Sequence, residues 1–440
     1  MGTAAHPQHH RRGVNAAAVE TLERAQHPIS RREIDPNVLK VLYRLINAGY
    51  EAFLVGGSVR DLMLGRTPKD FDVGTSAHPQ QIRELFRNSR LIGRRFKLVH
   101  VFFGPQNIEV ATFRRRSEEV VAEGDPLIRH DNTFGTPQED AQRRDFTINA
   151  LFYDPKSFRV VDYTGGLLDL QARLIRTVDD PEVRMREDPV RMIRAVRFAA
   201  KLDFQLEAAT RDAIVRHRAD LLKTSTPRLV EEIFRTFTNA PPKRALLLMA
   251  ELGLLEVVLP FLYEHLRPQL DCLEAAHTTI AMGSLEAASE AGMLPSRALT
   301  LACLLADLWF ARSQLPQPGA DLITQLRERG FPRGEIERMR LLLNAAGRIA
   351  RPNHRLRGLS SRPYYEEART LFTLLPPAIF GPAPRRVEGS PPASVSSSRR
   401  RRRPRRRRLG ARRPDTTPSE NATATLTSVG GHSALDPRSL

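Results

Sequence analysis

Two aspartates, Asp70 and Asp72, have the spacing that most directly suggests chemistry. They belong to the run Asp70-Phe-Asp-Val73, whose residue types are typical of a short β-strand. Because side chains alternate along a strand, both carboxylates would lie on one face, roughly 6–7 Å apart along the backbone. Such a pair repels unless cations lie between its members, and two Mg²⁺ ions that serve in-line attack at phosphorus are the usual solution. The same spacing is also common among acids exposed in loops.

A Gly-Gly-Ser turn stands upstream of the aspartates. Gly56-Gly57-Ser58 joins a predicted strand to a predicted helix over 58–64. Backbone N–H groups that no side chain shields can bind phosphate oxygens there, and the start of a helix favours negative charge. Arg60 follows within the first helical turn and would add a guanidinium for triphosphate oxygens. An ordinary turn is the alternative. However, the combination of a Gly-Gly-Ser turn between a strand and a helix with a strand that carries paired aspartates is much rarer than either feature alone.

A third carboxylate would complete the ligands of such metal ions. Glu109 stands in the apolar run 108–111, and Asp145 follows two arginines, Arg143 and Arg144. A charged residue between apolar neighbours requires an explanation, and a metal ligand is one. The exposed face of an edge strand is the other explanation, and residue types alone do not decide between them.

Several ordered motifs resemble one enzyme family. Leu54-Val-Gly-Gly-Ser-Val-Arg-Asp61 with Leu64-Gly65 and Asp70-Phe-Asp72 resembles the catalytic signature of class II nucleotidyltransferases, which comprise CCA-adding enzymes and bacterial poly(A) polymerases. Further blocks agree in order and spacing: Glu109, Arg143-Arg-Asp-Phe-Thr-Ile-Asn-Ala150, Glu187-Asp-Pro-Val-Arg191 with Arg194 and Arg197, and Arg228 with Glu232. The resemblance covers about residues 35–260.

The resemblance implies a role for each matched residue. Asp70, Asp72 and Glu109 would hold two Mg²⁺ ions, with Asp145 as a further catalytic residue. The incoming nucleotide would be bound by Gly56, Gly57, Ser58, Arg60, Arg144, Asn149, Asp188, Arg191, Arg194 and Arg197. Glu187, Arg228 and Glu232 would support base recognition.

The base-reading block also makes physical sense by itself. Asp188, Arg191, Arg194 and Arg197 recur every three residues, so they would share one face of a helix. An aspartate and an arginine there can pair with the hydrogen-bonding edge of a base, while the other arginines face phosphates. A solvated charged stripe is the alternative.

The choice between adenylate and CCA addition depends on resemblance alone. Residues 91–101 resemble a short signature of bacterial poly(A) polymerases, as does the stretch from Asn132 to Ala141. We therefore expect a template-independent poly(A) polymerase that adds AMP from ATP to RNA 3′ ends, in mRNA polyadenylation and RNA decay. A CCA-adding tRNA nucleotidyltransferase is the alternative within the family. An RNA-binding protein with an inactive head is the alternative from another class.

The elements that position these residues change in type along the chain. Strand and helix patterns mix over 35–175, which predicts an α+β nucleotidyltransferase head with a mixed sheet. Helical spacing dominates from 176, which predicts a helical neck over 176–240 for base recognition and an RNA-binding helical body over 241–375. We expect a flexible leader over 1–34.

Composition limits the remaining possibilities. The 440 residues carry a net charge of +18, and residues 385–440 contribute fourteen arginines against four acids. This excess favours a polyanionic partner. Residues 376–440 are rich in Pro, Ser and Arg, which predicts disorder, and a shifted reading frame would give a similar tail. Two distant cysteines and the absence of a membrane-length apolar run fit a cytoplasmic protein without a transmembrane segment. We expect a monomer, and the family resemblance implies ATP, single-stranded RNA 3′ ends and RNA-decay proteins as its partners.

Overall fold

A computed structural model describes residues 19–93, 98–116, 133–311, 320–351 and 358–381. Some features noted above lie outside these ranges: residues 94–97 of the stretch 91–101, Asn132, residues 1–18 of the leader and residues 382–440 of the tail.

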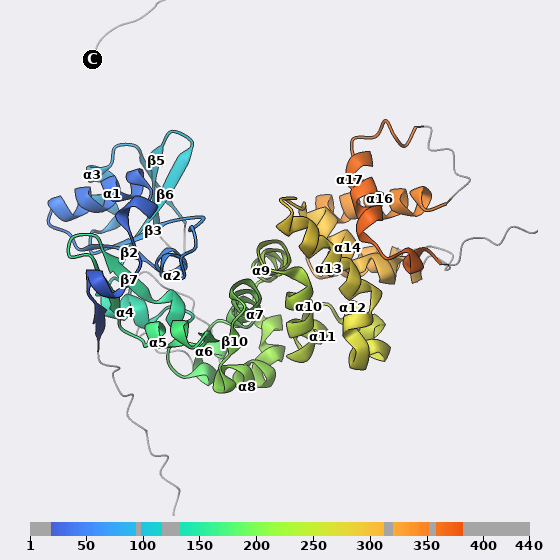
Figure 1. Cartoon of the computed structure of the whole chain (residues 1–440), viewed down its shortest axis with the longest axis horizontal. Helices are drawn as coiled ribbons and strands as arrows, with labels where there is room; N and C mark the ends of the chain where they lie inside the picture. The colour runs from blue at the N-terminus through green and yellow to red at the C-terminus, as the bar shows by residue number, and fades with distance from the viewer. Residues whose placement is uncertain (1–18, 94–97, 117–132, 312–319, 352–357, 382–440) are drawn as a thin grey trace, which may run out of the picture. The chain divides into compact units, whose positions relative to one another are not determined.

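The head is built on one eight-stranded sheet (Figure 1). Its strands are β1 (Glu20–Leu22), β2 (Ala52–Val55), β3 (Asp72–Thr75), β4 (Ser89–Ile92), β5 (Leu98–Phe103), β6 (Gln106–Thr112), β7 (Leu151–Asp154) and β8 (Arg159–Asp162). They are arranged in the order β1-β8-β7-β2-β3-β6-β5-β4. Strands β3 and β6 are parallel, whereas the other neighbours are antiparallel. The predicted mixed sheet is therefore confirmed.

Short helices accompany this sheet. They are α1 (Pro36–Asn47), α2 (Gly57–Met63), α3 (Pro79–Leu85), α4 (Pro137–Gln142) and α5 (Gly166–Gln171). Helix α1 begins where Asp35 accepts a hydrogen bond from the amide of Asn37 (2.7 Å), and its apolar face, including Leu42 and Leu45, is completely buried. Gly49, at a φ of +89°, follows the end of α1 in the left-handed conformation that glycine favours.

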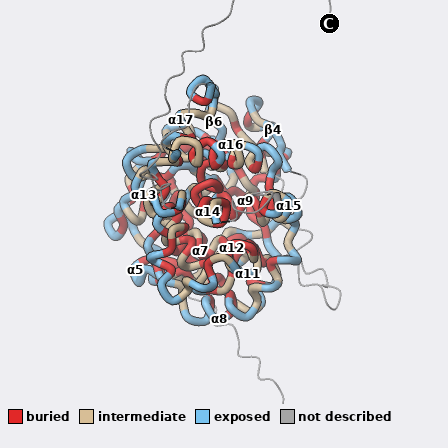
Figure 2. The backbone as a smooth tube through the Cα atoms, turned by 90° about the vertical axis from the view of Figure 1, so that its right-hand side faces the viewer, coloured by how far each residue is buried: buried red, intermediate tan, exposed pale blue. Residues whose placement is uncertain are grey.

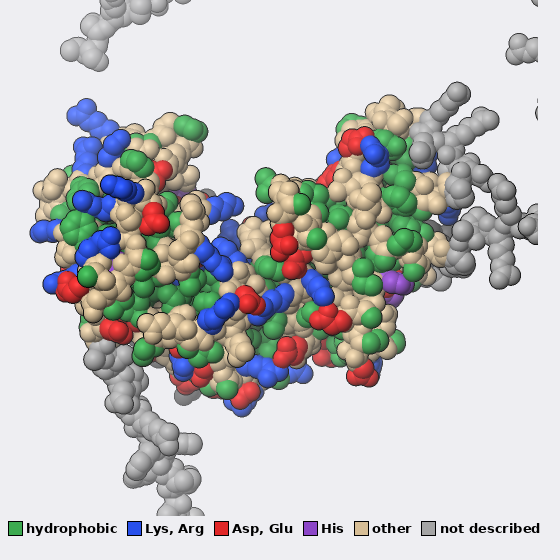
Figure 3. Space-filling view, viewed as in Figure 1, with side chains coloured by type: hydrophobic (Ala, Val, Ile, Leu, Met, Phe, Trp, Pro, Cys, Tyr) green, Lys and Arg blue, Asp and Glu red, His purple; other side chains and the backbone are tan. Residues whose placement is uncertain are grey.

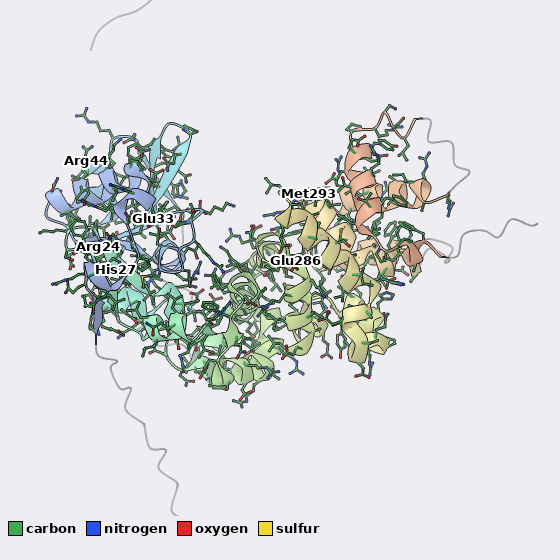
Figure 4. All side chains as sticks on the ribbon, viewed as in Figure 1. Arg24, His27, Glu33, Arg44, Glu286 and Met293 are labelled. Carbon is green, nitrogen blue, oxygen red and sulfur yellow. The ribbon has the colours of Figure 1, made fainter. Side chains whose placement is uncertain are left out.

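The N-terminal segment joins the fold earlier than the sequence indicates. Strand β1 pairs with β8, and His27 Nε2 lies 2.9 Å from the carbonyl oxygen of Phe158. The His27 ring also packs edge-on against Tyr153. Figure 4 shows His27 beside Arg24 in the head. The segment from Glu20 onward therefore belongs to the head, in contrast to the leader expected over 1–34.

Helices dominate the rest of the described chain. They are α6 (Pro181–Glu187), α7 (Val190–Leu202), α8 (Ala208–His217), α9 (Thr226–Asn239), α10 (Pro242–Glu251), α11 (Leu254–Val258), α12 (Pro260–Leu266), α13 (His277–Glu290), α14 (Arg297–Ala311), α15 (Ala320–Glu328), α16 (Arg333–Ile349) and α17 (Tyr365–Leu374). After residue 176, the described residues form one strand, β10 (Gln205–Leu206), which pairs with β9 (Leu174–Ile175). The expected change to helical structure is confirmed, and none of the described helices is long and apolar enough to cross a membrane.

Helix α14 is the centre of the body. It is apolar on nearly all sides, it contacts α9, α13, α16 and α17, and it is mostly buried (Figure 2). Phe310 near its end packs on Phe380, with ring centroids 5.0 Å apart. Phe380 belongs to a short 3₁₀ helix over Pro377–Phe380, so the fold continues past the boundary expected at 376.

Three polar side chains, Asp307, His265 and His277, form a cluster within the helical body. Asp307 of α14 has His265 Nε2 2.8 Å from one carboxylate oxygen and His277 Nδ1 3.0 Å from the other. Desolvation raises the pKa of Asp307, but the hydrogen bonds and charges of the two histidines outweigh it and hold the pKa below its usual value.

This cluster predicts a pH-dependent loss of stability for Asp307→Asn. Because the pKa of Asp307 is lowered in the folded chain, its stabilising contribution is present above the unfolded value of about 3.9 and is lost as pH falls through the folded value. Urea unfolding at pH 6 is expected to show the variant less stable than the parent chain. The difference is expected to shrink below about pH 4. A constant difference at all pH values would contradict this account.

Candidate active site

The glycine turn has a backbone that other residues do not readily adopt. Gly56 connects β2 to α2 at φ +73° and ψ −130°, and its amide donates to the carbonyl oxygen of Leu151 (3.0 Å). Ser58 is buried, and its hydroxyl donates to the carbonyl oxygen of Val55 (3.1 Å). The turn is therefore fixed by its own hydrogen bonds, and phosphate binding by its amides stays a prediction.

Arg60 is engaged inside the protein. Its Nε and Nη2 donate to Asp61 Oδ1 (2.9 and 2.6 Å), and its Nη1 donates to Asn149 Oδ1 (2.5 Å). The residue is buried, with the guanidinium carbon 5.2 Å from the centroid of the Phe198 ring. These contacts connect α2 to the 3₁₀ helix over Thr147–Asn149. The expected contact of Arg60 with the triphosphate stays a prediction.

The metal-binding candidates meet at adjacent strands. Strand β3 begins at Asp72, whose direct register partner on parallel β6 is Glu109. Asp70 precedes β3, so the expectation that Asp70 and Asp72 lie on one face of the same strand is wrong. Although Asp72 is exposed, desolvation and then repulsion by Glu109 raise its pKa to about 6; Arg144 opposes this rise and Asp70 adds to it. Asp72 is therefore influenced electrostatically by the other two carboxylates.

The carboxylates of the described residues do not form a compact metal-binding group. Among the described residues, no group of three His, Cys, Asp or Glu side chains is close enough to hold a metal ion. Glu109 is exposed and lies 3.5 Å from Nε2 of His100, its register partner on β5. The contact of His100 with Glu109 was not predicted from the sequence. The pairing of its strand with β6 in a hairpin could have indicated this contact.

Asp145 is held by contacts on both carboxylate oxygens. Arg194 donates to Oδ2 through Nε (2.8 Å) and Nη2 (2.5 Å), while Asn149 and the amide of Phe146 donate to Oδ1 (3.1 and 2.9 Å). Desolvation raises the pKa of Asp145, but Arg194 and these hydrogen bonds outweigh it and hold the pKa well below its usual range. The geometry favours an orienting role, and the expected catalytic role stays a prediction.

Arg144 lies between the glycine turn and the carboxylates. Asp140 binds it through Nη2 (2.8 Å) and also binds Nε of Arg143 (3.0 Å), while Arg144 Nη1 donates to the carbonyl oxygen of Asn149 (3.3 Å). The sequence analysis missed the role of Asp140, which is buried and orients both arginines. Only the position of Asp140 four residues before Arg144 on α4 could have indicated it.

Arg191, Arg194 and Arg197 lie along α7 and take part in ion pairs. Asp188 lies before this helix, at the end of α6 with φ −148° and ψ 87°, so the expectation that it shares one helical face with the arginines is wrong. Arg228 of α9 binds both oxygens of Asp188 (2.7 and 2.6 Å), and Glu232 accepts from Nε of Arg197 (2.6 Å). Arg228 and Glu232 thus contact the residues that they were expected to support, and their role in base recognition stays a prediction. Charged side chains of both signs are interspersed on the visible surface around these helices (Figure 3). The face is therefore an ordered network rather than a solvated stripe.

Arg191 is buried next to this network. Its Nη1 donates to the carbonyl oxygen of Arg184 (2.9 Å) and to Glu187 Oε2 (3.2 Å). The structure thus brings Glu187 to the base-reading helix as expected, while recognition of a base by Asp188 and Arg191 stays a prediction.

Replacement of Gly56 by Ala is expected to destabilise the chain. A Cβ at Gly56 would stand 2.7 Å from Nη1 of Arg144 at a positive φ, which together cost about 1–2 kcal/mol. Gly57→Ala is the matched control, because its nearest contact would be an ordinary 3.6 Å to Arg60. Urea unfolding compares the two variants, and an equal loss of stability in both would contradict this reason.

Two family models match parts of the chain. Residues 52–176 match the family model described as the poly A polymerase head domain. Residues 203–266 match the model described as a probable RNA and SrmB-binding site of polymerase A.

Individual relatives fall into two groups. The chain is 56% identical over 219 residues to poly(A) polymerase I of Salmonella typhi, covering 48% of this chain and 47% of that protein. It is 37% identical over 218 residues to the CCA-adding enzyme of Bacillus velezensis, covering 50% and 54%. The chain thus spans about half the length of the curated relatives it matches.

A solved structure has the same fold over a longer part of the chain. The CCA-adding enzyme of Bacillus stearothermophilus in complex with CTP superposes with a TM-score of 0.60 and 29% identity, covering 79% of this chain and 81% of that one. The head and the helices that follow are thus similar in sequence to poly(A) polymerases and similar in fold to a CCA-adding enzyme.

Proposed function

We propose that the chain is a template-independent nucleotidyltransferase that adds AMP from ATP to the 3′ end of RNA. The observation that carries this proposal is the pairing of Asp72 with Glu109 across β3 and β6, with Asp70 just before β3. These carboxylates raise the pKa of Asp72 together with desolvation. A site that concentrates negative charge in this way favours the binding of cations.

The donor set fits divalent metal ions. Carboxylate oxygens are the ligands that Mg²⁺ prefers, and Asp70, Asp72 and Glu109 would hold two ions. Such ions, when bound, activate the RNA 3′-hydroxyl and stabilise the leaving pyrophosphate. The chain's own residues then bind and orient the reactants, which is the main protein contribution to nucleotidyl transfer.

The nucleotide would lie between the glycine turn and helix α7. The amides of Gly57 and Ser58 and the guanidinium groups of Arg60 and Arg144 would bind its phosphates. Asp145 and Asn149, already joined by a hydrogen bond, would orient its ribose. The base would meet Asp188 and Arg191, while the ion pairs of Arg194 and Arg197 keep α7 in place.

Adenylate specificity is supported by the relatives. Over nearly equal lengths, the chain is 56% identical to a protein named poly(A) polymerase I and 37% identical to a CCA-adding enzyme. CCA addition is the second candidate, since the superposed structure is that of a CCA-adding enzyme. The match to an RNA-binding model over 203–266 supports RNA as the acceptor. The free cysteines Cys272 and Cys303 fit a reducing cytoplasm.

One assay separates these activities. An unstructured RNA and a tRNA without its terminal CCA are incubated with Mg²⁺ and ATP, CTP or both. Long A-tails on the unstructured RNA with ATP alone are expected. Addition of two C residues and one A to the tRNA alone would favour the CCA-adding activity. Binding of RNA without any incorporation would favour the inactive RNA-binding protein.

A further inference from the structure

Arg184 of α6 has no part in the proposed mechanism, yet it is the largest side chain that is fully buried in the described chain. Removal of a guanidinium from water is costly unless acceptors in the protein replace the lost hydration. The position of these acceptors therefore indicates what the buried cation does.

The acceptors of Arg184 belong to two different elements. Nη2 donates to the carbonyl oxygens of two consecutive residues, Arg143 (2.6 Å) and Arg144 (2.5 Å). Nη1 donates to Glu187 Oε2 (2.5 Å), at the end of α6. A planar guanidinium can reach both acceptor groups at once, because its donors point in fixed directions. Arg184 thus joins the main chain of the turn at residues 143–145 to the carboxylate of Glu187.

The same carboxylate leads to the base-reading helix. Glu187 Oε2 also accepts from Arg191 Nη1 (3.2 Å), and that Nη1 donates to the carbonyl oxygen of Arg184 (2.9 Å). The other end of the turn is bound to α7 through Asp145 and Arg194. Two independent connections therefore join the turn to α7, one through the main chain and one through a side chain.

Burial accounts for the electrostatics of this connection. Desolvation, followed by repulsion from Arg191 and Arg116, lowers the pKa of Arg184 to about 9, while Glu187 opposes this effect. The side chain remains cationic at neutral pH. Its Nε is buried and has no acceptor among the described residues. The guanidinium is thus oriented toward the two carbonyls and Glu187 even though one of its donors is left unsatisfied.

We propose that Arg184 is a positioning residue, which fixes the ribose-binding turn at residues 143–145 to the base-reading helix α7 so that both sides of the nucleotide site form one unit. This role rests on the proposed function, because it assumes that Asp145, Asn149 and Arg191 bind the nucleotide. The hydrogen bonds of Arg184 go to Arg143, Arg144 and Glu187, and not to the strands that carry Asp72 and Glu109. Loss of Arg184 would therefore weaken nucleotide binding more than it slows the chemical step.

The test compares Arg184→Ala and Arg184→Lys with Arg186→Ala. Arg186 is exposed on the same helix and donates only to the carbonyl oxygen of Glu182 (3.3 Å), so its removal should change neither parameter. For Arg184→Ala, KM for ATP is expected to rise about 10–100-fold, the range that loss of an orienting neighbour produces at other sites, with a much smaller change in kcat. The Lys variant, which keeps the charge without the planar fork, is expected to show a smaller rise in KM.

Chemical rescue adds a second readout. Arg184→Ala leaves a space shaped for a guanidinium, so millimolar guanidinium is expected to lower KM again, whereas equal urea is not. If the Ala variant does not fold, the KM of the Lys variant decides. A normal KM with reduced kcat, or a rise in KM that guanidinium does not reverse in a folded Ala variant, would overturn the proposal. An inactive parent chain would instead overturn the proposed function, and fluorescent ATP-analogue binding would then still test Arg184.

Discussion

Asp72→Asn is expected to reduce nucleotide incorporation at least about a thousandfold while the chain stays folded. The substitution removes one charge from the carboxylate group that would hold the metal ions, whose stabilisation of the transition state is worth several kcal/mol. Asp70→Asn is expected to have a similar effect. Incorporation of labelled AMP into an unstructured RNA, together with an RNA gel-shift assay, measures the two properties separately.

The controls for this prediction use charge and pH. Asp212→Asn changes an exposed carboxylate of α8 and is expected to leave incorporation unchanged. Because the folded pKa of Asp72 is raised to about 6, its contribution to stability is present below the unfolded value and is lost as pH rises through about 6. Without metal at pH 8, Asp72→Asn is therefore expected to be at least as stable as the parent chain. Near-normal incorporation by either Asp variant would eliminate the two-metal assignment.

Arg194→Met is expected to lower the free energy of unfolding by about 3 kcal/mol. It leaves the carboxylate of Asp145 without the cation that holds its pKa down, and removal of one partner from a buried pair costs about 3–5 kcal/mol. The lower end applies because the Arg194 side chain is 29% exposed. Urea unfolding at neutral pH, followed by circular dichroism, measures the loss.

A double variant separates the ion pair from the rest of the contact. Asp145→Asn with Arg194→Met removes both charges, so it is expected to be more stable than Arg194→Met alone. If the losses of stability of Asp145→Asn and Arg194→Met add up to the loss of the double variant, the two charges are not coupled. Nucleotide incorporation is expected to be low in all three variants, because each disturbs the segment proposed to orient the ribose.

Local features of the site were predictable from the sequence. Gly56 was found from its place between a strand and a helix, and its positive φ gives the physical reason for glycine there. The paired strands that carry Glu109 were also predictable, because their alternating apolar residues surround a Gly-Pro turn. Asp70 was assigned to a strand because the pattern covers too few residues to define where β3 begins.

Long-range contacts were not predictable in the same way. Arg60 bonds to Asn149, 89 positions along the chain, so its spacing from the glycine turn could not reveal that it is already engaged. Arg184 was missed for a different reason. Arginine is rarely buried, and sequence periodicity places it on a charged helix rather than under the carbonyls of another element. Such contacts depend on tertiary packing, which short motifs do not encode.

The pairing of β3 with β6 also limits which insertions and deletions this chain could tolerate. Glu109 is exposed between Ile108 and Val110, which are both buried. A deletion of one residue within β6 would exchange the two faces, so that a carboxylate enters the core and an isoleucine or valine takes its place beside Asp72. Length changes of one residue are therefore compatible with the site only outside the strand, for example at the Gly104-Pro105 turn.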